Sequence, residues 1–234
     1  GEGVPDGKWR VGSRLRFGER DAPCAASDGL RLHVFGGWDN DEDDALASGE
    51  YAECIDPTAP LEWREQPPLA QPRCFAAAAC DEASRLWVVG GGDSLYRGAE
   101  CFDSIVVLAG GAWTSVGALL HPRCGLALGL DARRSDLWIA GGYSGDDSYL
   151  QAVETFDMVT GRAASVAPMS HRRSGLGVAF GPDGAVYACG GSEDGANALY
   201  SAERIDPREG RWRPLPDMHT ARGYLASTFG LDGH

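Results

Sequence analysis

The chain has 234 residues, and its 21 Lys and Arg against 34 Asp and Glu give a formal net charge of -13. That charge has the wrong sign for holding a phosphate backbone, so nucleic acid is not expected as a partner. No stretch approaches the roughly 18 consecutive apolar residues of a membrane helix, and no signal peptide is visible, so no membrane partner is expected. The 33 glycines are typical of many short strands joined by tight turns.

In chain order, residues 1–19 carry Trp9 and then the segment 10–17, which we predict to be the outer strand of an incomplete unit. The first full unit covers residues 20–72, with strands predicted at 22–27, 30–37, 51–56 and around Trp63. Equivalent units are predicted at 73–122, 123–172 and 173–221, and residues 222–234 begin another with an inner strand at 224–229. A fixed period near this length indicates a repeat architecture.

Each unit repeats the same landmarks. A pair of glycines ends the second strand, where glycine permits positive φ and a close approach of neighbouring sheets. The pairs are Gly36/Gly37, Gly90/Gly91, Gly141/Gly142 and Gly190/Gly191. Tryptophans that we expect to fill space between successive sheets stand at Trp9, Trp63, Trp113 and Trp212, with Arg162 where the series skips one.

An arginine opens each unit, and a Glu followed three residues later by an Asp recurs in each third strand. The arginines are Arg20, Arg73, Arg123, Arg173 and Arg222, and the carboxylate pairs are Glu53/Asp56, Glu100/Asp103, Glu154/Asp157 and Glu203/Asp206. A glycosidase needs one carboxylate pair that converges on one substrate rather than one pair per unit. We therefore predict that these carboxylates make structural hydrogen bonds or ion pairs with the repeated arginines.

With this register the chain resembles the kelch-repeat family, whose unit is one four-stranded blade of a β-propeller. The resemblance covers nearly all of the chain. It implies an all-β fold in which residues 1–234 form a single kelch propeller domain, with four complete blades and partial blades at both ends. Because kelch adaptors close with about six blades, it also implies that this chain is part of a longer, six-bladed propeller.

Two features could suggest a metal. Asp39, Asp41, Asp43 and Glu50 occupy the first, third, fifth and twelfth positions of a calcium-loop pattern, but Asp44 stands where that loop needs glycine. A solvated acidic loop is the favoured interpretation. A histidine also lies just before the opening arginine of successive units, at His121, His171 and His219. Because these histidines recur with the repeat, we interpret them as polar loop residues rather than as ligands of one metal. No metal or cofactor is expected.

The seven cysteines fit neither zinc spacing nor a compact disulfide framework. A reducing compartment is the simpler inference, which favours the cytoplasm, with the nucleus as the alternative. The seven cysteines are Cys24, Cys54, Cys74, Cys80, Cys101, Cys124 and Cys189.

The candidate recognition surface is formed by the loops between second and third strands, at 38–50, 92–99, 143–152 and 192–201. These loops vary while the strands around them repeat, and recognition is usually placed on such loops. Their aromatic and arginine side chains fit an interface hot spot. They are Trp38, Tyr96, Arg97, Tyr143, Tyr149 and Tyr200.

Residues 169–179 and 194–207 look most like the units of kelch-like adaptors of cullin ubiquitin ligases. That resemblance implies that a substrate peptide contacts residues after the glycine pairs, in the following loops and after the opening arginine. In this chain, Trp38 and Tyr143 follow glycine pairs, and Ser174 follows an opening arginine. The residues in the following loops are Arg97, Tyr149 and Ala198.

The expected function is a non-catalytic protein-interaction module, because no base, nucleophile and electrophilic group converge in the sequence. The resemblance implies substrate recognition for a cullin-RING ubiquitin ligase, with the cullin bound through regions outside this chain. A structural subunit of a larger assembly is the alternative, and a kelch-fold oxidase or sugar mutarotase is a weaker one. The partner is expected to be a protein or peptide, with a basic segment because this chain is acidic.

Overall fold

The computed structural model describes residues 13–229 except residues 17, 54–61, 97, 132 and 147, with the side chains of Glu50 and Glu53 also outside the description. Within these residues every regular element is a β-strand and none is a helix. The described part of the chain accordingly holds no helix that could cross a membrane.

Four sheets of four antiparallel strands make up the fold, and in each the strands pair in chain order. The first contains β1 (Cys24–Ser27), β2 (Arg31–Phe35), β5 (Gly49–Glu53) and β6 (Trp63–Gln66). The second contains β7 (Ala77–Cys80), β8 (Leu86–Val89), β9 (Ser104–Ala109) and β10 (Ala112–Ala118). The third contains β11 (Ala127–Asp131), β12 (Asp136–Ala140), β13 (Val153–Asp157) and β14 (Arg162–Val166). The fourth contains β15 (Gly177–Phe180), β16 (Val186–Cys189), β17 (Ala202–Asp206) and β18 (Arg211–Leu215).

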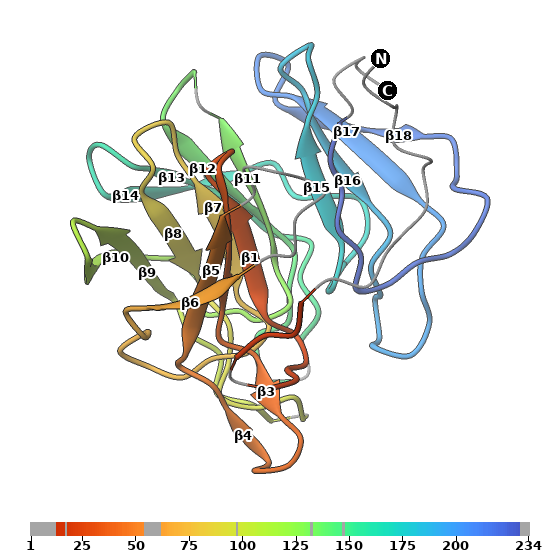
Figure 1. The fold of residues 1–234 in the computed structure, drawn as a ribbon. Helices are drawn as coiled ribbons and strands as arrows, with labels where there is room; N and C mark the ends of the chain where they lie inside the picture. The colour runs from red at the N-terminus through yellow and green to blue at the C-terminus, as the bar shows by residue number, and fades with distance from the viewer. Residues whose placement is uncertain are drawn as a thin grey trace, which may run out of the picture.

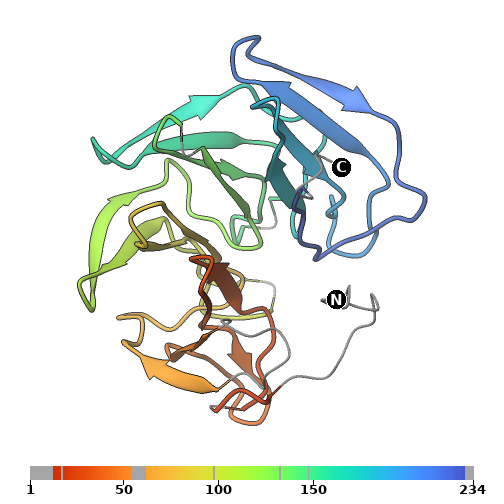
Figure 2. The ribbon, with the colours of Figure 1, turned by 45° about the horizontal axis from the view of Figure 1, so that its top comes forward.

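The four sheets stand side by side around a common centre as the blades of a propeller (Figures 1 and 2). The first strands lie innermost, and β1 contacts β7, β7 contacts β11, and β11 contacts β15. The start of every first strand therefore faces one central channel. Loops from different blades meet at its end.

The core lies between blades rather than within them. The second strands are short apolar runs buried on both faces, and all four residues of β8 are buried. Between the second and third blades, Trp87 packs edge-on against Phe156 with ring centroids 6.3 Å apart. A single blade cannot bury both of its faces, so stability comes from stacked neighbours.

The tryptophans of the fourth strands link their blades to the preceding part of the chain. The indole N–H of Trp113 donates to the carbonyl of Pro67, and that of Trp212 donates to the carbonyl of Ala167, each at 2.8 Å. The indole of Trp63 reaches the carbonyl of Ser13 at 3.2 Å. Trp9 lies outside the described residues.

The opening arginines and the glycine pairs form one recurring contact. The guanidinium of Arg173 donates to the carbonyl of Gly190 in its own blade at 2.7 Å. Its backbone carbonyl accepts the N–H of Gly142 in the preceding blade, also at 2.7 Å. The same backbone contact joins Gly37 to Arg73, Gly91 to Arg123 and Gly191 to Arg222. Arg73, Arg123 and Arg173 thus each tie two blades together.

The predicted pairing of the repeated arginines is confirmed for the Glu of each carboxylate pair in the third and fourth blades. Arg123 pairs with Glu154, and Arg173 pairs with Glu203 at 3.0 Å, all with almost no exposed side-chain surface. The Asp of each pair makes other contacts: Asp157 accepts the backbone N–H groups of Val159 and Thr160, and Asp206 pairs with Arg208. In the first two blades the assignment of Glu53 and Glu100 to this position was wrong.

The loops before the third strands differ in length, which shifts the register. In each blade, the N–H of the first glycine of the pair donates to the carbonyl two residues before the carboxylate position. In the first two blades these carbonyls belong to Ser48 and Ser104. Glu50 and Val106 are therefore the positions equivalent to Glu154 and Glu203. Glu53 ends β5, and Glu100 is exposed before β9. Without a carboxylate partner among the described residues, the Arg73 guanidinium lies over the Phe102 ring, 5.1 Å from its centroid.

The acidic loop at 38–50 forms a short hairpin of β3 (Trp38–Asp39) and β4 (Asp44–Ala45). The Asp39 carboxylate accepts the backbone N–H groups of Asp41 at 2.9 Å and Glu42 at 3.3 Å, so it closes the turn. In the described ranges no group of three His, Cys, Asp or Glu residues could hold a metal ion.

No strand forms in the described parts of the two predicted terminal strands. Residues 13–16 and 18–19 are not in a strand, and the rest of that prediction lies outside the described residues. The inner strand predicted at 224–229 was wrong, because no second strand in the described chain pairs with it. The segment still packs on the fourth blade, with the Phe229 and Tyr187 rings 4.9 Å apart and the Leu225 N–H 3.4 Å from the carbonyl of Gly175.

Candidate functional site

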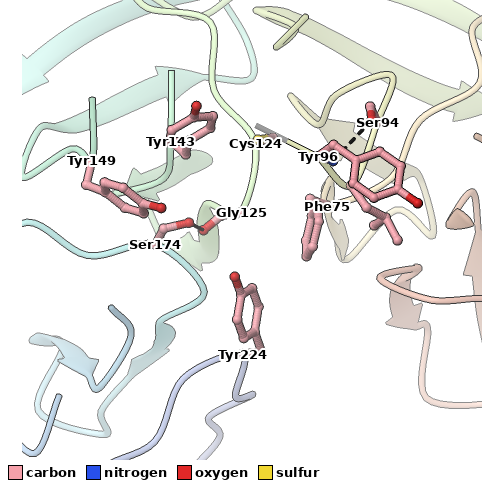
Figure 3. A pocket seen from close by; sticks show the side chains of 10 residues that line it. Phe75, Ser94, Tyr96, Cys124, Gly125, Tyr143, Tyr149, Ser174 and Tyr224 are labelled. Atoms are coloured by element: carbon pink, nitrogen blue, oxygen red, sulfur yellow. Dashed lines mark hydrogen bonds between the residues drawn. The ribbon is translucent and has the colours of Figure 1, made fainter. Parts of the chain in front are cut away.

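A bowl opens where the loops after the second strands meet the starts of the first strands. It holds about 470 Å³ and adjoins a channel depression of about 990 Å³, both counted with the open solvent at their mouths. Figure 3 shows tyrosines and a phenylalanine around it, from loops far apart in the sequence. The lining residues are Phe75, Ser94, Leu95, Tyr96, Cys124, Gly125, Tyr143, Tyr149, Ser174 and Tyr224.

A repeated left-handed turn directs side chains to the centre. The residue two places after each opening arginine has positive φ: Ala22 (47°), Phe75 (52°), Gly125 (61°), Gly175 (61°) and Tyr224 (53°). Bulky residues rarely adopt this conformation, and it persists where surrounding structure enforces it. Phe75 and Tyr224 nevertheless adopt it, and their ring centroids lie 5.8 Å apart in the wall shared by bowl and channel.

Tyr143 and Tyr149 form the wall contributed by the third blade. An isolated antiparallel bridge pairs the two residues, and their rings lie 5.2 Å apart at 54°. Tyr143 is buried, whereas Tyr149 is half-buried. The Tyr149 hydroxyl abuts Gly195 in the loop of the fourth blade, where an added Cβ would overlap it. Contact with a neighbouring loop therefore holds Tyr149 in place.

Tyr96 stands on the opposite side of the bowl with 62% of its surface exposed. Its ring packs edge-on against the buried Trp38 at 5.8 Å, and its hydroxyl donates to the Asp43 carboxylate at 3.1 Å. Trp38 thus supports the wall from beneath and is not itself part of the lining.

The structure brings together four of the residues predicted for partner binding: Tyr96, Tyr143, Tyr149 and Ser174. Ala198, which pairs with Ser192, and the exposed Tyr200 lie outside the bowl. Arg97 lies outside the described residues. Sequence analysis missed Phe75 and Tyr224, although both are aromatic where the third and fourth units have glycine.

The family model described as Kelch motif matches residues 172–219, which contain the fourth blade. The solved structure of YjhT is similar over 98% of this chain and 80% of its own, with a TM-score of 0.82 and 14% sequence identity. The fold is a kelch-type β-propeller. No curated protein matches the chain.

Two thiols of the kelch propeller meet beside the bowl. The Sγ atoms of Cys101 and Cys124 lie 3.1 Å apart, although the residues come from neighbouring blades, and Cys124 lines the bowl. The hydrogen bond between them lowers the pKa of Cys101 and raises that of Cys124, and burial raises the Cys124 pKa further. Cys101 is therefore the thiol of this pair that loses its proton first.

We expect dilute peroxide to join Cys101 and Cys124 in a disulfide. The Cys101 thiolate would attack peroxide, breaking the O–O bond and releasing hydroxide, to give a sulfenic acid. The Cys124 sulfur would then attack the sulfenic sulfur and displace its oxygen as water, so that two thiols are oxidised and one peroxide is reduced to two waters. Non-reducing peptide mapping measures the product. The half-buried Cys189 is the control for exposure, and Cys101→Ser should leave Cys124 reduced, so that a thiol reagent labels it after denaturation. Cys101 recovered as sulfinic acid beside an unmodified Cys124 would contradict the expectation.

Proposed function

We propose that this kelch propeller is a protein-interaction module that binds a peptide segment of its partner in the aromatic bowl. The observation that carries the proposal is the convergence of Phe75, Tyr96, Tyr143, Tyr149 and Tyr224 on one open depression. Exposed aromatic side chains in a concave, rigidly supported surface are the usual anchors of protein recognition.

The backbone at the bowl also favours a binding role. Phe75 and Tyr224 hold left-handed conformations that cost free energy, and such outliers concentrate at functional sites. The lining that the structure describes offers phenol, hydroxyl and thiol groups but no carboxylate or imidazole. Because His, Glu and Asp are the side chains that most often act as general acids and bases, this lining favours recognition over catalysis.

A finer proposal is that the module selects substrates for a cullin-RING ubiquitin ligase. Its support is the similarity of residues 169–179 and 194–207 to the units of kelch-like adaptors. The cullin would bind through regions outside this chain. Co-capture of a cullin with the intact protein is the expected result, and capture of bowl-dependent partners with no cullin would favour the assembly-subunit alternative.

Replacing Tyr149 or Tyr224 by alanine should weaken partner binding at least tenfold, because hot-spot truncations cost about 2 kcal/mol or more. Binding of a partner recovered with the intact protein would be measured by calorimetry. Tyr200→Ala is the matched control, since Tyr200 is an exposed tyrosine on the next loop outside the bowl. If only Tyr200→Ala weakened binding, the recognition site would lie outside the bowl.

A further inference from the structure

The described residues that line the bowl and the channel beneath it carry no positive charge. Among the described residues that line either cavity, Asp21 is the one charged residue, and it lies in the channel. An anionic ligand would therefore find no counter-charge among the described residues of these walls. Burying a charge without a partner is costly, so the lining discriminates against carboxylates and phosphates.

The loops of this face are strongly acidic. The segments 38–50, 92–99, 143–152 and 192–201 carry eleven acidic residues and a single basic one, Arg97. Hydrogen bonds from Ser144 and Ser148 lower the pKa of Asp146, and those from Asn197 lower the pKa of Asp194. Both carboxylates consequently stay ionised at neutral pH, and the face attracts cations.

The walls of the bowl suit a cation for a second, independent reason. Tyr143 and Tyr149 stand on one side, Phe75 and Tyr96 on the other, and Tyr224 closes a third (Figure 3). The negative face of an aromatic ring attracts ammonium and guanidinium groups, and several rings around one depression form the cage that binds alkylated ammonium groups. The bond that the Tyr96 hydroxyl donates to Asp43 raises the Tyr96 pKa, so that phenol stays protonated.

We infer that the bowl receives a cationic side chain of the partner peptide, either lysine, N-methylated lysine or arginine. This inference rests on the proposed function and names the ligand class of the same site. The acidic loops draw the basic segment to this face, and the aromatic walls hold its charged group. Carboxylates on the loops add attraction that salt screens.

The test uses synthetic peptides that are identical except for one central residue, which is lysine, trimethyllysine, arginine, norleucine or glutamate. Binding to the full chain is measured by fluorescence anisotropy. Each cationic peptide should bind at least about tenfold more tightly than the norleucine peptide, and the difference should shrink as salt is raised. Equal binding of the lysine and norleucine peptides, or tighter binding of the glutamate peptide, would overturn the inference.

Two variants assign the preference to the rings. Tyr224→Leu should abolish the difference between lysine and norleucine peptides, while Tyr224→Phe, which keeps the ring face, should retain it. Binding of choline and of its neutral isostere 3,3-dimethylbutanol tests whether the bowl binds a small free cation rather than a cationic side chain of a peptide. Weak choline binding beside tight peptide binding supports a peptide occupant. If choline bound as tightly as the cationic peptides, the assignment of a peptide as the occupant would be overturned.

Failure of this inference is distinguishable from failure of the proposed function. If Tyr149→Ala weakens binding of a captured partner whose binding segment is neutral or acidic, the module binds proteins through the bowl but the cationic assignment is wrong. If Tyr149→Ala and Tyr224→Ala both leave partner binding unchanged, the proposed function of the bowl fails first.

Discussion

Replacing Arg173 by methionine is expected to lower the free energy of unfolding by about 3–5 kcal/mol, the usual cost of breaking a buried ion pair. Arg173 has no exposed surface and its guanidinium donates to the Glu203 carboxylate and to the carbonyls of Gly190 and Ser201. Removing it leaves Glu203, itself 1% exposed, as a buried charge without its cationic partner. Urea denaturation followed by tryptophan fluorescence measures the loss.

The charge on Glu203 explains why the loss should be large. Burial raises the pKa of Glu203, but hydrogen bonds from the Ser170 N–H and from Arg173 lower it more, so the folded-state pKa lies below the ordinary value. The carboxylate is thus ionised at neutral pH. Because its folded-state pKa is depressed, its contribution is present above the unfolded-state pKa and is lost as the pH falls through the folded-state pKa.

Two comparisons test the mechanism. Arg172→Met changes the exposed arginine that directly precedes Arg173 and should alter the free energy of unfolding by less than about 0.5 kcal/mol. Adding Glu203→Gln to Arg173→Met removes the stranded charge and should recover part of the loss. If the double variant were no more stable than Arg173→Met, the lost carbonyl contacts of Arg173 would carry the effect, and the account of a stranded carboxylate would be wrong.

The propeller was predictable because its determinants are local and repeat. Apolar runs that end at glycine pairs mark the second strands, and their recurrence indicates stacked equivalent units. The structure confirms this all-β arrangement. The predicted strand positions of Glu53 and Glu100 in the first two blades were wrong. The loops before β5 and β9 differ in length, so counting residues along the sequence does not give the position of a carboxylate within the strand.

The bowl was only partly predictable. Tyr96, Tyr143 and Tyr149 stand in variable loops, so loop chemistry points to them directly. Phe75 and Tyr224 reach the bowl through a left-handed backbone turn, and their own residue types do not indicate positive φ. The signal for this turn is the glycine at the equivalent positions of the third and fourth units. The contact between Cys101 and Cys124 depends on how two blades stack, which residue spacing does not specify.

Replacing Gly141 by alanine is the other change with a large expected effect. Gly141 has φ of +63°, which costs about 1–2 kcal/mol for a residue with a Cβ. The added Cβ would also overlap the carbonyl oxygen of Arg173, the same oxygen that accepts the N–H of Gly142 from the preceding blade. Overpacking of this kind adds about 1–3 kcal/mol, because backbone cannot move aside as a flexible side chain can. Thermal or urea unfolding measures the sum.

Gly110→Ala separates the two costs. Gly110 has nearly the same φ, +59°, but no atom lies within 4 Å of its added Cβ, so it should show the conformational cost alone. The excess loss in Gly141→Ala then measures how tightly the third and fourth blades meet at the Arg173 carbonyl. Equal losses in the two variants would mean that the blades separate freely at this contact. In that case the glycine pair would be required for its backbone conformation, and the close approach between blades would not explain its recurrence.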